Sequence, residues 1–243
     1  MAARCQIDAI GLPTFVNFSR RPELFSSSFE KGDNMSLRSH VIAILEGSTV
    51  ARIRFRFPIA GSNVTIAPQT FHRVSRAIRA GAVSVAVPTD LAAGVAAQYN
   101  DVARTRADGT AVAANTLEVR STAGRLDGSF VVHESLHCAY DLLRTGIDGN
   151  AEEASAYVCS ALYCRMTGLP KPRWAGPGIY AQAEQVARTL LAQYQRGDVA
   201  IPTVGLAEWA ALRLSVAVHP AYPASAPGGF SGMLLGAQYT HDG

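Results

Sequence analysis

Two histidines and a glutamate, spaced as His133-Glu134-x-x-His137, are the residues of this chain best suited to chemistry. On a helix, residues four apart lie one turn apart on the same face, so both imidazoles can point at one metal ion. Glu134 lies about 100° around the helix from His133, which lets its carboxylate reach a metal-bound water without being a ligand. The spacing is typical of a zinc site.

The same spacing also fits an ordinary buried helix whose two core histidines are satisfied by hydrogen bonds. Apolar residues surround the motif and predict a buried helix on either interpretation: Val131, Val132, Leu136, Leu142 and Leu143. Two further features favour the metal. A carboxylate that could serve as a third ligand follows the motif, and a strand-like segment precedes it.

The third ligand is expected on a second helix that begins near Asn150. Residues 144–150 are rich in turn-forming residues and can reverse the chain, so this helix can return antiparallel to the first. Glu152 and Glu153 then compete for the metal. We choose Glu153, because the small Ala156 and the aromatic Tyr157 follow it at helical spacing. Glu152 is interpreted as a solvated acid in the first turn, favoured by the helix dipole.

These two segments resemble the gluzincin metallopeptidases, of which thermolysin is the familiar member. The resemblance is carried by H-E-S-L-H-C-A-Y-D at residues 133–141 and by E-A-S-A-Y at residues 153–157. It includes an aspartate four residues after the second histidine, Asp141. It covers about residues 110–165 and implies that the strand before the active helix borders the substrate cleft.

The resemblance implies Zn²⁺ held by His133, His137 and Glu153, with Glu134 as the general base. The chain departs from thermolysin-like enzymes at Tyr157, where they have an aspartate, although a phenol can also serve as a hydrogen-bond partner for a histidine. A further donor is needed to stabilise an oxyanion. The candidates are His219, Tyr222 and Tyr157.

Composition limits the other possible functions. The 243 residues are 48% hydrophobic and 17% charged, which indicates a globular protein with a full core. A net charge of +3 favours neither a nucleic acid nor a membrane surface as partner, and no apolar run is long enough for a bilayer span. The expected partner is a protein or peptide substrate.

The N-terminal region and the cysteines bear on location. The first 18 residues lack a continuous apolar segment, so we expect no secretion signal and a cytoplasmic location. A polar stretch follows, and Met35 offers an alternative start. Cys159 and Cys164 lie on different faces of one predicted helix, which disfavours a disulfide and indicates thiols in a reducing compartment. Cys138 is expected to be a buried packing residue.

The remaining segments predict a domain from 35 to 223, preceded by an extension at 1–34 and followed by a flexible tail at 224–243. Within residues 40–67 we expect strands, including the strict alternation of arginine and apolar residues at 52–57. That arginine face either binds an anionic ligand or is simply solvated. Further expected elements are helices at 68–80, 90–102, 179–194 and 206–218, strands at 82–87 and 115–121, and a loop at 104–109.

The predicted fold is therefore α+β, with a small N-terminal sheet and helices followed by a helical half that carries the zinc site. The leading hypothesis for function is zinc-dependent hydrolysis of peptide bonds, in which Glu134 activates water. The alternative is a metal-stabilised binding or effector module with little general proteolysis. An open coordination position would favour the enzyme, and a closed site would favour the module.

Overall fold

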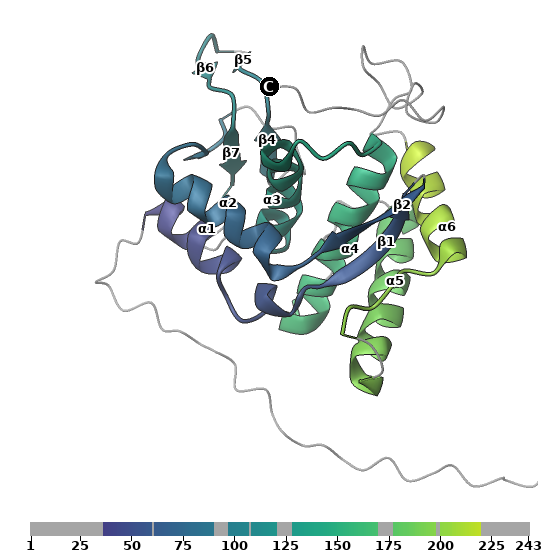
Figure 1. Ribbon diagram of the computed structural model, residues 1–243. Coiled ribbons are helices and arrows are strands. Elements are labelled where there is room, and N and C mark those ends of the chain that lie inside the picture. The colour runs from purple at the N-terminus through teal and green to yellow at the C-terminus, as the bar shows by residue number, and fades with distance from the viewer. Residues whose placement is uncertain are drawn as a thin grey trace, which may run out of the picture. The chain divides into compact units, whose positions relative to one another are not determined.

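The computed structural model describes residues 36–59, 61–89, 97–106, 108–120, 128–169, 177–197 and 200–219. Within these ranges, strands and short helices come first and a helical half follows, so the predicted α+β class is confirmed (Figure 1). The predicted extension 1–34, the predicted tail 224–243 and Tyr222 lie outside the described residues.

The chain begins with helix α1 (Leu37–Leu45) and the 3₁₀ turn η1 (Val50–Arg52). The expectation of strands from residue 40 was therefore wrong up to residue 54. Ser36 caps α1, because its hydroxyl accepts a hydrogen bond from the backbone N–H of Ser39. Val41 and Leu45 are buried one turn apart. Packing of this helical face therefore outweighs the strand preference of the β-branched residues in the segment.

Strands β1 (Phe55–Ile59) and β2 (Ser62–Ile66) lie within the segment where strands were predicted, and they pair as an antiparallel hairpin. The predicted alternation is also confirmed, since Ile53, Phe55 and Phe57 are buried while the arginines between them are exposed. The segment around Thr203 pairs with β1 through two backbone hydrogen bonds of Arg56. This links the hairpin to the C-terminal part of the chain.

Helix α2 (Pro68–Ala80) has the predicted bounds, with Phe71, Val74 and Ile78 buried. Strand β3 (Ser84–Ala86) lies inside the predicted strand 82–87. It pairs in parallel with β7 (Thr116–Val119), which in turn pairs antiparallel with β4 (Ala97–Asn100). The three strands form one small sheet in the order β3-β7-β4.

This sheet corrects two expectations. Residues 97–100 are a strand rather than the end of a helix, because Ala97 to Asn100 pair along the whole of β7; residues 90–96 lie outside the description. The family resemblance implies that an extended substrate adds to the edge of the strand before the H-E-x-x-H helix, but that strand, β7, is paired on both sides and has no free edge. Tertiary pairing decided both points.

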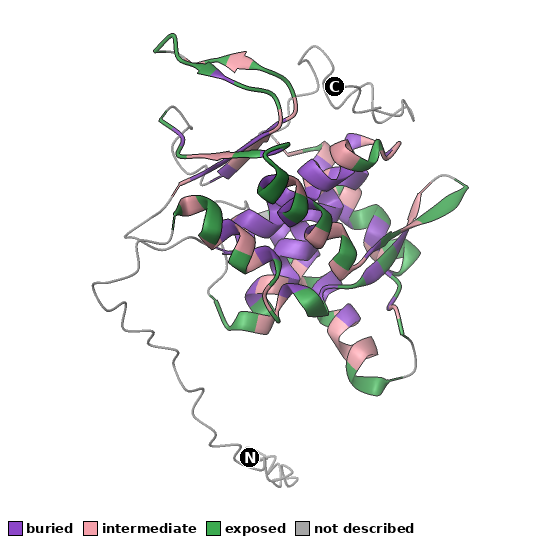
Figure 2. Ribbon diagram, turned by 60° about the vertical axis from the view of Figure 1, so that its left-hand side comes forward, coloured by how far each residue is buried: buried purple, intermediate pink, exposed green. Residues whose placement is uncertain are grey.

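Residues 104–105, predicted as loop, form the short strand β5 (Arg104–Thr105), which pairs with β6 (Ala111–Val112). Two-residue strands carry too little periodicity to be recognised in a sequence. Figure 2 shows this hairpin as mostly exposed, in contrast to the buried central helices.

The helical half consists of α3 (Gly128–Leu143), α4 (Gly149–Thr167), α5 (Pro177–Arg196) and α6 (Leu206–Ala217). All four were predicted. Helix α4 packs against α3, α5 and α6, while α3 also packs against α1 and α2, so these two helices lie at the centre of the core (Figure 1). No helix in the described ranges combines the length and the apolarity that crossing a bilayer requires.

Candidate metal centre

Helix α3 carries the two histidines and is buried along most of its length. Val131, Val132 and Leu136 are fully buried, as predicted, whereas Leu143 is 41% exposed because it lies in the last turn, beyond the core. The helix begins at Gly128, where a Cβ would lie only 2.3 Å from the hydroxyl oxygen of Tyr163 on α4. Glycine at this position therefore allows the two helices to approach closely.

Helix α4 returns antiparallel to α3, as predicted. Arg144 adopts a left-handed backbone conformation (φ 48°) in the connection. Asp148 then caps α4 by accepting a hydrogen bond from the backbone N–H of Ala151. The start of α3 faces Tyr163 near the end of α4, while Tyr140 near the end of α3 bonds Ser155 near the start of α4.

The pairing brings together the metal cluster, which we define as His133, His137 and Glu153. Their ligand atoms all lie within 4.8 Å of one another. Nε2 of His133 is 3.5 Å from Oε2 of Glu153, and Nε2 of His137 is 3.7 Å from Oε1 of the same carboxylate. A tetrahedral zinc with bonds of about 2.0–2.1 Å separates its ligand atoms by roughly 3.4 Å. The donor set and its spacing therefore fit Zn²⁺.

Glu152 is not the solvated acid that we expected. It is buried, with 6% of its surface exposed, and its Oε1 lies 2.7 Å from Nδ1 of His137. Because the crossing of α3 over α4 turns this side of α4 toward His137, both adjacent glutamates contact that histidine, one at each ring nitrogen. A carboxylate on the far nitrogen orients a metal-binding imidazole and makes it a stronger ligand.

A signal for this role was present in the sequence. The followers of Glu153 indicated close packing, but Glu152 is likewise followed, three and four positions on, by the small and fully buried Ser155 and Ala156. The same argument therefore applied to both glutamates. Sequence spacing alone could not tell which carboxylate would meet which ring nitrogen.

The carboxylates in and around the metal cluster, those of Glu153, Glu152 and Glu134, carry more negative charge than its two histidines balance. Burial disfavours the protonated form of His137, yet the charges of Glu153 and Glu152 outweigh it and raise its pKa to about 10. Burial alone would raise the pKa of Glu153, but the two histidines hold it below its usual value. With no metal bound, the proton on His137 therefore supplies positive charge that partly compensates the surrounding carboxylates.

Glu134 is held beside the metal cluster by a strand that the motif did not reveal. Its Oε2 accepts a hydrogen bond from the backbone N–H of Tyr99 on β4, at 2.9 Å. Its charge also raises the pKa of His137, so it lies close to the cluster without belonging to it. This hydrogen bond fixes the orientation of the Glu134 carboxylate relative to β4.

The side chain of Tyr99 fastens β4 to helix α3. Its hydroxyl donates to Oδ2 of Asp141 at 2.6 Å and lies 2.8 Å from Oδ1 of Asn115. Burial raises the pKa of this phenol, which stays protonated and able to donate. Asp141, singled out by the family resemblance, therefore supports the strand that holds Glu134. Tyr99 itself was missed, because the segment was expected to be helical.

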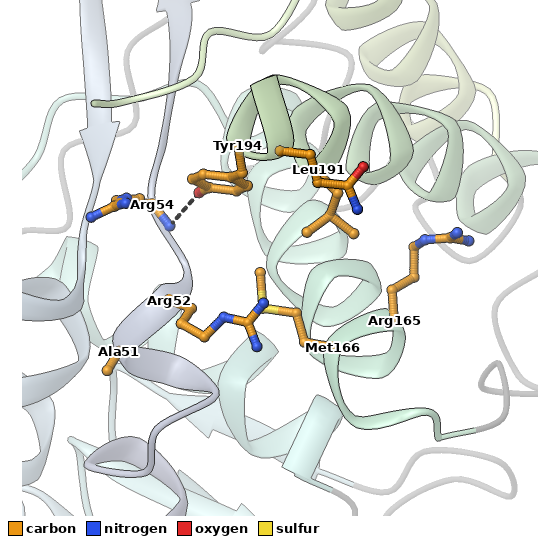
Figure 3. A pocket seen from close by; sticks show the side chains of 8 residues that line it. Ala51, Arg52, Arg54, Arg165, Met166, Leu191 and Tyr194 are labelled. Carbon is orange, nitrogen blue, oxygen red and sulfur yellow. Dashed lines mark hydrogen bonds between the residues drawn. The ribbon is translucent and has the colours of Figure 1, made fainter. Parts of the chain in front are cut away.

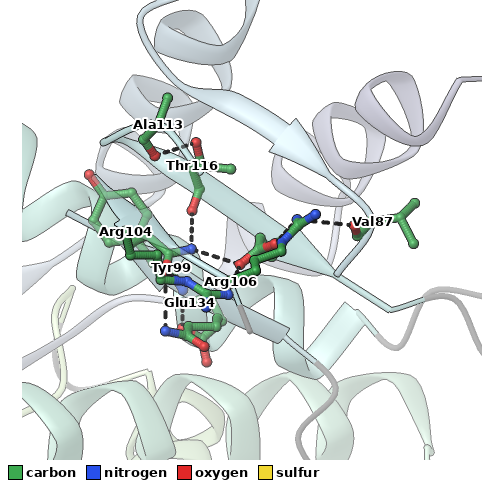
Figure 4. A network of polar contacts seen from close by, with 10 residues as sticks. Val87, Tyr99, Arg104, Arg106, Ala113, Thr116 and Glu134 are labelled. Atoms are coloured by element: carbon green, nitrogen blue, oxygen red, sulfur yellow. Dashed lines mark hydrogen bonds and ion pairs between the residues drawn. The ribbon is translucent and has the colours of Figure 1, made fainter. Parts of the chain in front are cut away.

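A second group of charges anchors the same strand from the β5 side. We call it the arginine cluster, and Figure 4 shows it together with Tyr99 and Glu134. The fully buried carboxylate of Glu118 accepts hydrogen bonds from Arg104 (2.6 Å), from Arg106 and from the side-chain amide of Asn100 (3.0 Å). Burial opposes ionisation of Glu118, but the arginines lower its pKa.

The two remaining predicted residues differ in position. Tyr157 is buried and packs edge-on against His133, with ring centroids 4.9 Å apart. It therefore lies beside the metal cluster. His219 follows the end of α6, where its backbone N–H donates to Val216, and its ring is not among the ligand groups that converge on the cluster. The oxyanion role of both residues stays a prediction.

The cluster is partly open to solvent. The side chains of His137 and Glu153 are 14% and 17% exposed, whereas that of His133 is 5% exposed. Within the described ranges, three side chains converge as ligands and none of the remaining cysteines, histidines or acids joins them. Three protein ligands with solvent access are typical of a catalytic zinc site rather than of a structural one.

The chain was compared with family models, with curated proteins and with solved structures, and it matches none of them. The gluzincin resemblance therefore rests on the motif, on its third ligand and on the geometry described above.

Proposed function

We propose that this protein is a zinc-dependent peptidase. The observation that carries the proposal is the convergence of His133, His137 and Glu153, with Glu134 held beside them by a backbone hydrogen bond and left out of the ligand set. A module that only needed a structural metal would have no use for a fixed carboxylate next to an open site.

His133, His137 and Glu153 would hold the zinc, with Glu152 orienting His137 through Nδ1. Bound zinc would acidify a water molecule and polarise the scissile carbonyl. Glu134 would accept the proton of that water and deliver it to the leaving amine. The hydrogen bond from the backbone N–H of Tyr99 fixes the orientation of this carboxylate, so Glu134 is already oriented before proton transfer.

The proposed substrates are proteins or peptides, and the proposed location is the cytoplasm. The location is supported by the described cysteines, since Cys138, Cys159 and Cys164 are buried and none of them forms a disulfide. The metal-stabilised binding module remains the alternative function. The open side of the metal cluster and the position of Glu134 favour the enzyme over it.

The test uses purified protein and its Glu134→Gln variant. Elemental analysis should find close to one zinc per chain in both, because Glu134 is not a ligand. Hydrolysis of an unstructured substrate such as casein should fall about 10²–10⁴-fold in the variant, the usual contribution of a general base.

Glu46→Gln is a suitable control, since Glu46 pairs with Arg79 on the surface. It should retain both zinc and activity. A zinc-loaded wild type that cleaves no peptide of a diverse library, or a Glu134→Gln variant as active as wild type, would exclude the peptidase and leave the binding module. Protein purified without metal, despite zinc in the medium, would exclude both.

A further inference from the structure

A second site lies at the other end of α4, where the exposed arginine face predicted from the sequence meets the helical half. A cavity of about 400 Å³ opens between η1, the end of α4 and the end of α5. Figure 3 shows the side chains that surround it, of which the argument uses Arg52, Arg54, Arg165, Met166, Leu191 and Tyr194.

The polar part of the cavity is strongly basic. Three arginines from two separate parts of the chain line it, and no acidic residue is among the lining residues. Arg165 pairs with Glu184 at 2.9 Å, which neutralises one of the three charges. No carboxylate of the described residues pairs with Arg52 or Arg54, so two positive charges remain for a ligand.

The other wall of the cavity is apolar and aromatic. Leu191 and Tyr194 lie one turn apart on α5, and Met166 faces them from α4 (Figure 3). The guanidinium carbon of Arg54 lies 5.6 Å from the centre of the Tyr194 ring, and the hydroxyl of Tyr194 accepts a hydrogen bond from the backbone N–H of Arg54 at 2.9 Å. These contacts hold the aromatic ring at the rim.

We propose that this cavity binds a small organic phosphate. A phosphate dianion matches the two uncompensated guanidinium charges and offers three acceptor oxygens to their N–H groups, whereas a single carboxylate offers less charge and fewer acceptors. The ring of Tyr194 and the side chains of Leu191 and Met166 would then contact the organic part of the ligand.

The site is separate from the metal cluster. Arg165 follows Glu153 by twelve residues on α4, which places the two about 18 Å apart along the helix. The proposal therefore does not depend on peptidase activity, and binding can be measured directly on the metal-loaded or the metal-free protein.

The experiment is a calorimetric titration of the full chain with phenyl phosphate, with inorganic phosphate and with benzoate. Phenyl phosphate should bind with a Kd below about 1 mM and at least fivefold more tightly than either of the others. Arg52→Gln and Arg54→Gln should each weaken binding of phenyl phosphate about tenfold. Both arginines are exposed, so these variants should fold as wild type does.

Arg56→Gln is the matched control. Arg56 continues the exposed arginine face onto β1, but it reaches Thr65 on β2 and does not line the cavity. It removes the same charge and should leave the Kd within about twofold. Equal losses in all three variants would show a diffuse electrostatic effect, and absence of phenyl phosphate binding up to about 10 mM would show an empty, solvated cavity. If benzoate bound more tightly than phenyl phosphate, the ligand class of the cavity would be carboxylates and not organic phosphates. Each of these three results overturns the proposal.

Discussion

The metal cluster and the arginine cluster both hold wholly or partly buried carboxylates, but the sign of the excess charge around them is opposite. In the arginine cluster, one buried carboxylate, that of Glu118, meets two guanidinium groups and an amide. Around the metal cluster, the three carboxylates of Glu134, Glu152 and Glu153 surround only two histidines. Their charge raises the pKa of His137 to about 10. The carboxylate of the first group is fully paired by protein side chains, whereas the excess negative charge of the second favours binding of a cation.

This difference separates a structural role from a chemical one. A buried charge whose partners are all protein side chains stabilises one arrangement of the chain, and its removal leaves the partners uncompensated. A cluster that needs an external cation gains its full stability only when that cation binds. Since β4 contacts both groups, the fully paired one serves as the fixed support for the other.

The largest expected effect is the loss of zinc from Glu153→Ala. Structural zinc sites bind with about 10–16 kcal/mol, or roughly 3–4 kcal/mol for each ligand, so the dissociation constant should rise about 10²–10³-fold. Competition with a zinc indicator dye measures it. Glu118→Ala, in the arginine cluster, should leave zinc affinity within about threefold; equal losses in the two variants would erase the distinction between the clusters.

Next comes the stability of the arginine cluster. Glu118→Ala should lower the free energy of unfolding by about 3 kcal/mol, because Arg104 and Arg106 lose the buried carboxylate that compensates them. Urea denaturation of the metal-free protein measures the change. The exposed pair of Arg79 and Glu46 provides the comparison, and Glu46→Ala should cost less than about 1 kcal/mol. Similar costs would mean that β5 and its arginines are not part of the cooperative core.

A smaller effect is expected from Glu152→Gln. The amide keeps the size of the side chain but removes the charge beside Nδ1 of His137, so zinc affinity should fall about 10–100-fold. The variant should still bind one zinc, in contrast to Glu153→Ala. If Glu152→Gln were the more damaging of the two, the assignment of Glu153 as ligand would have to be exchanged with that of Glu152.

The last expected effect is a gradual dependence of zinc affinity on pH, smaller than the others for each pH unit. His137 must lose its proton to bind metal, and its pKa in the metal-free protein is raised to about 10. Zinc affinity should therefore rise about tenfold per pH unit between pH 6.5 and 8.5, with about one proton released on binding at pH 7.5. Calorimetry in buffers of different ionisation enthalpy counts that proton, and no release would mean that His137 is neutral before zinc binds.

The metal-free protein should show the same linkage in its stability. Because the folded pKa of His137 lies above its ordinary value of 6.5, the protonated ring stabilises the fold fully below pH 6.5, and this contribution is lost as the pH rises toward 10. Urea denaturation across this range should show the decline. Bound zinc should remove this decline in stability, since His137 is then unprotonated throughout the range from pH 6.5 to 10.

Local patterns in the sequence predicted the helices α2 to α6 of this protein and the candidate ligands on them, although α1 was expected to be a strand. Pro68 and Gly81 delimit α2, Asp148 and Gly168 delimit α4, and the motif places His133 and His137 one turn apart. These features depend on residues within a few positions of one another, so the chain carries them in any context.

Tertiary structure decided the partners of those ligands. Glu152 turned out to hold Nδ1 of His137, and Tyr99 to hold Glu134, through contacts between residues 15 and 35 positions apart. Strand β4 exists because β7 pairs with it, against a local pattern that suggested a helix. The side of α4 that faces a histidine depends on the crossing of two helices, and the strand that reaches a glutamate depends on sheet pairing. Neither is encoded in the spacing of neighbouring residues.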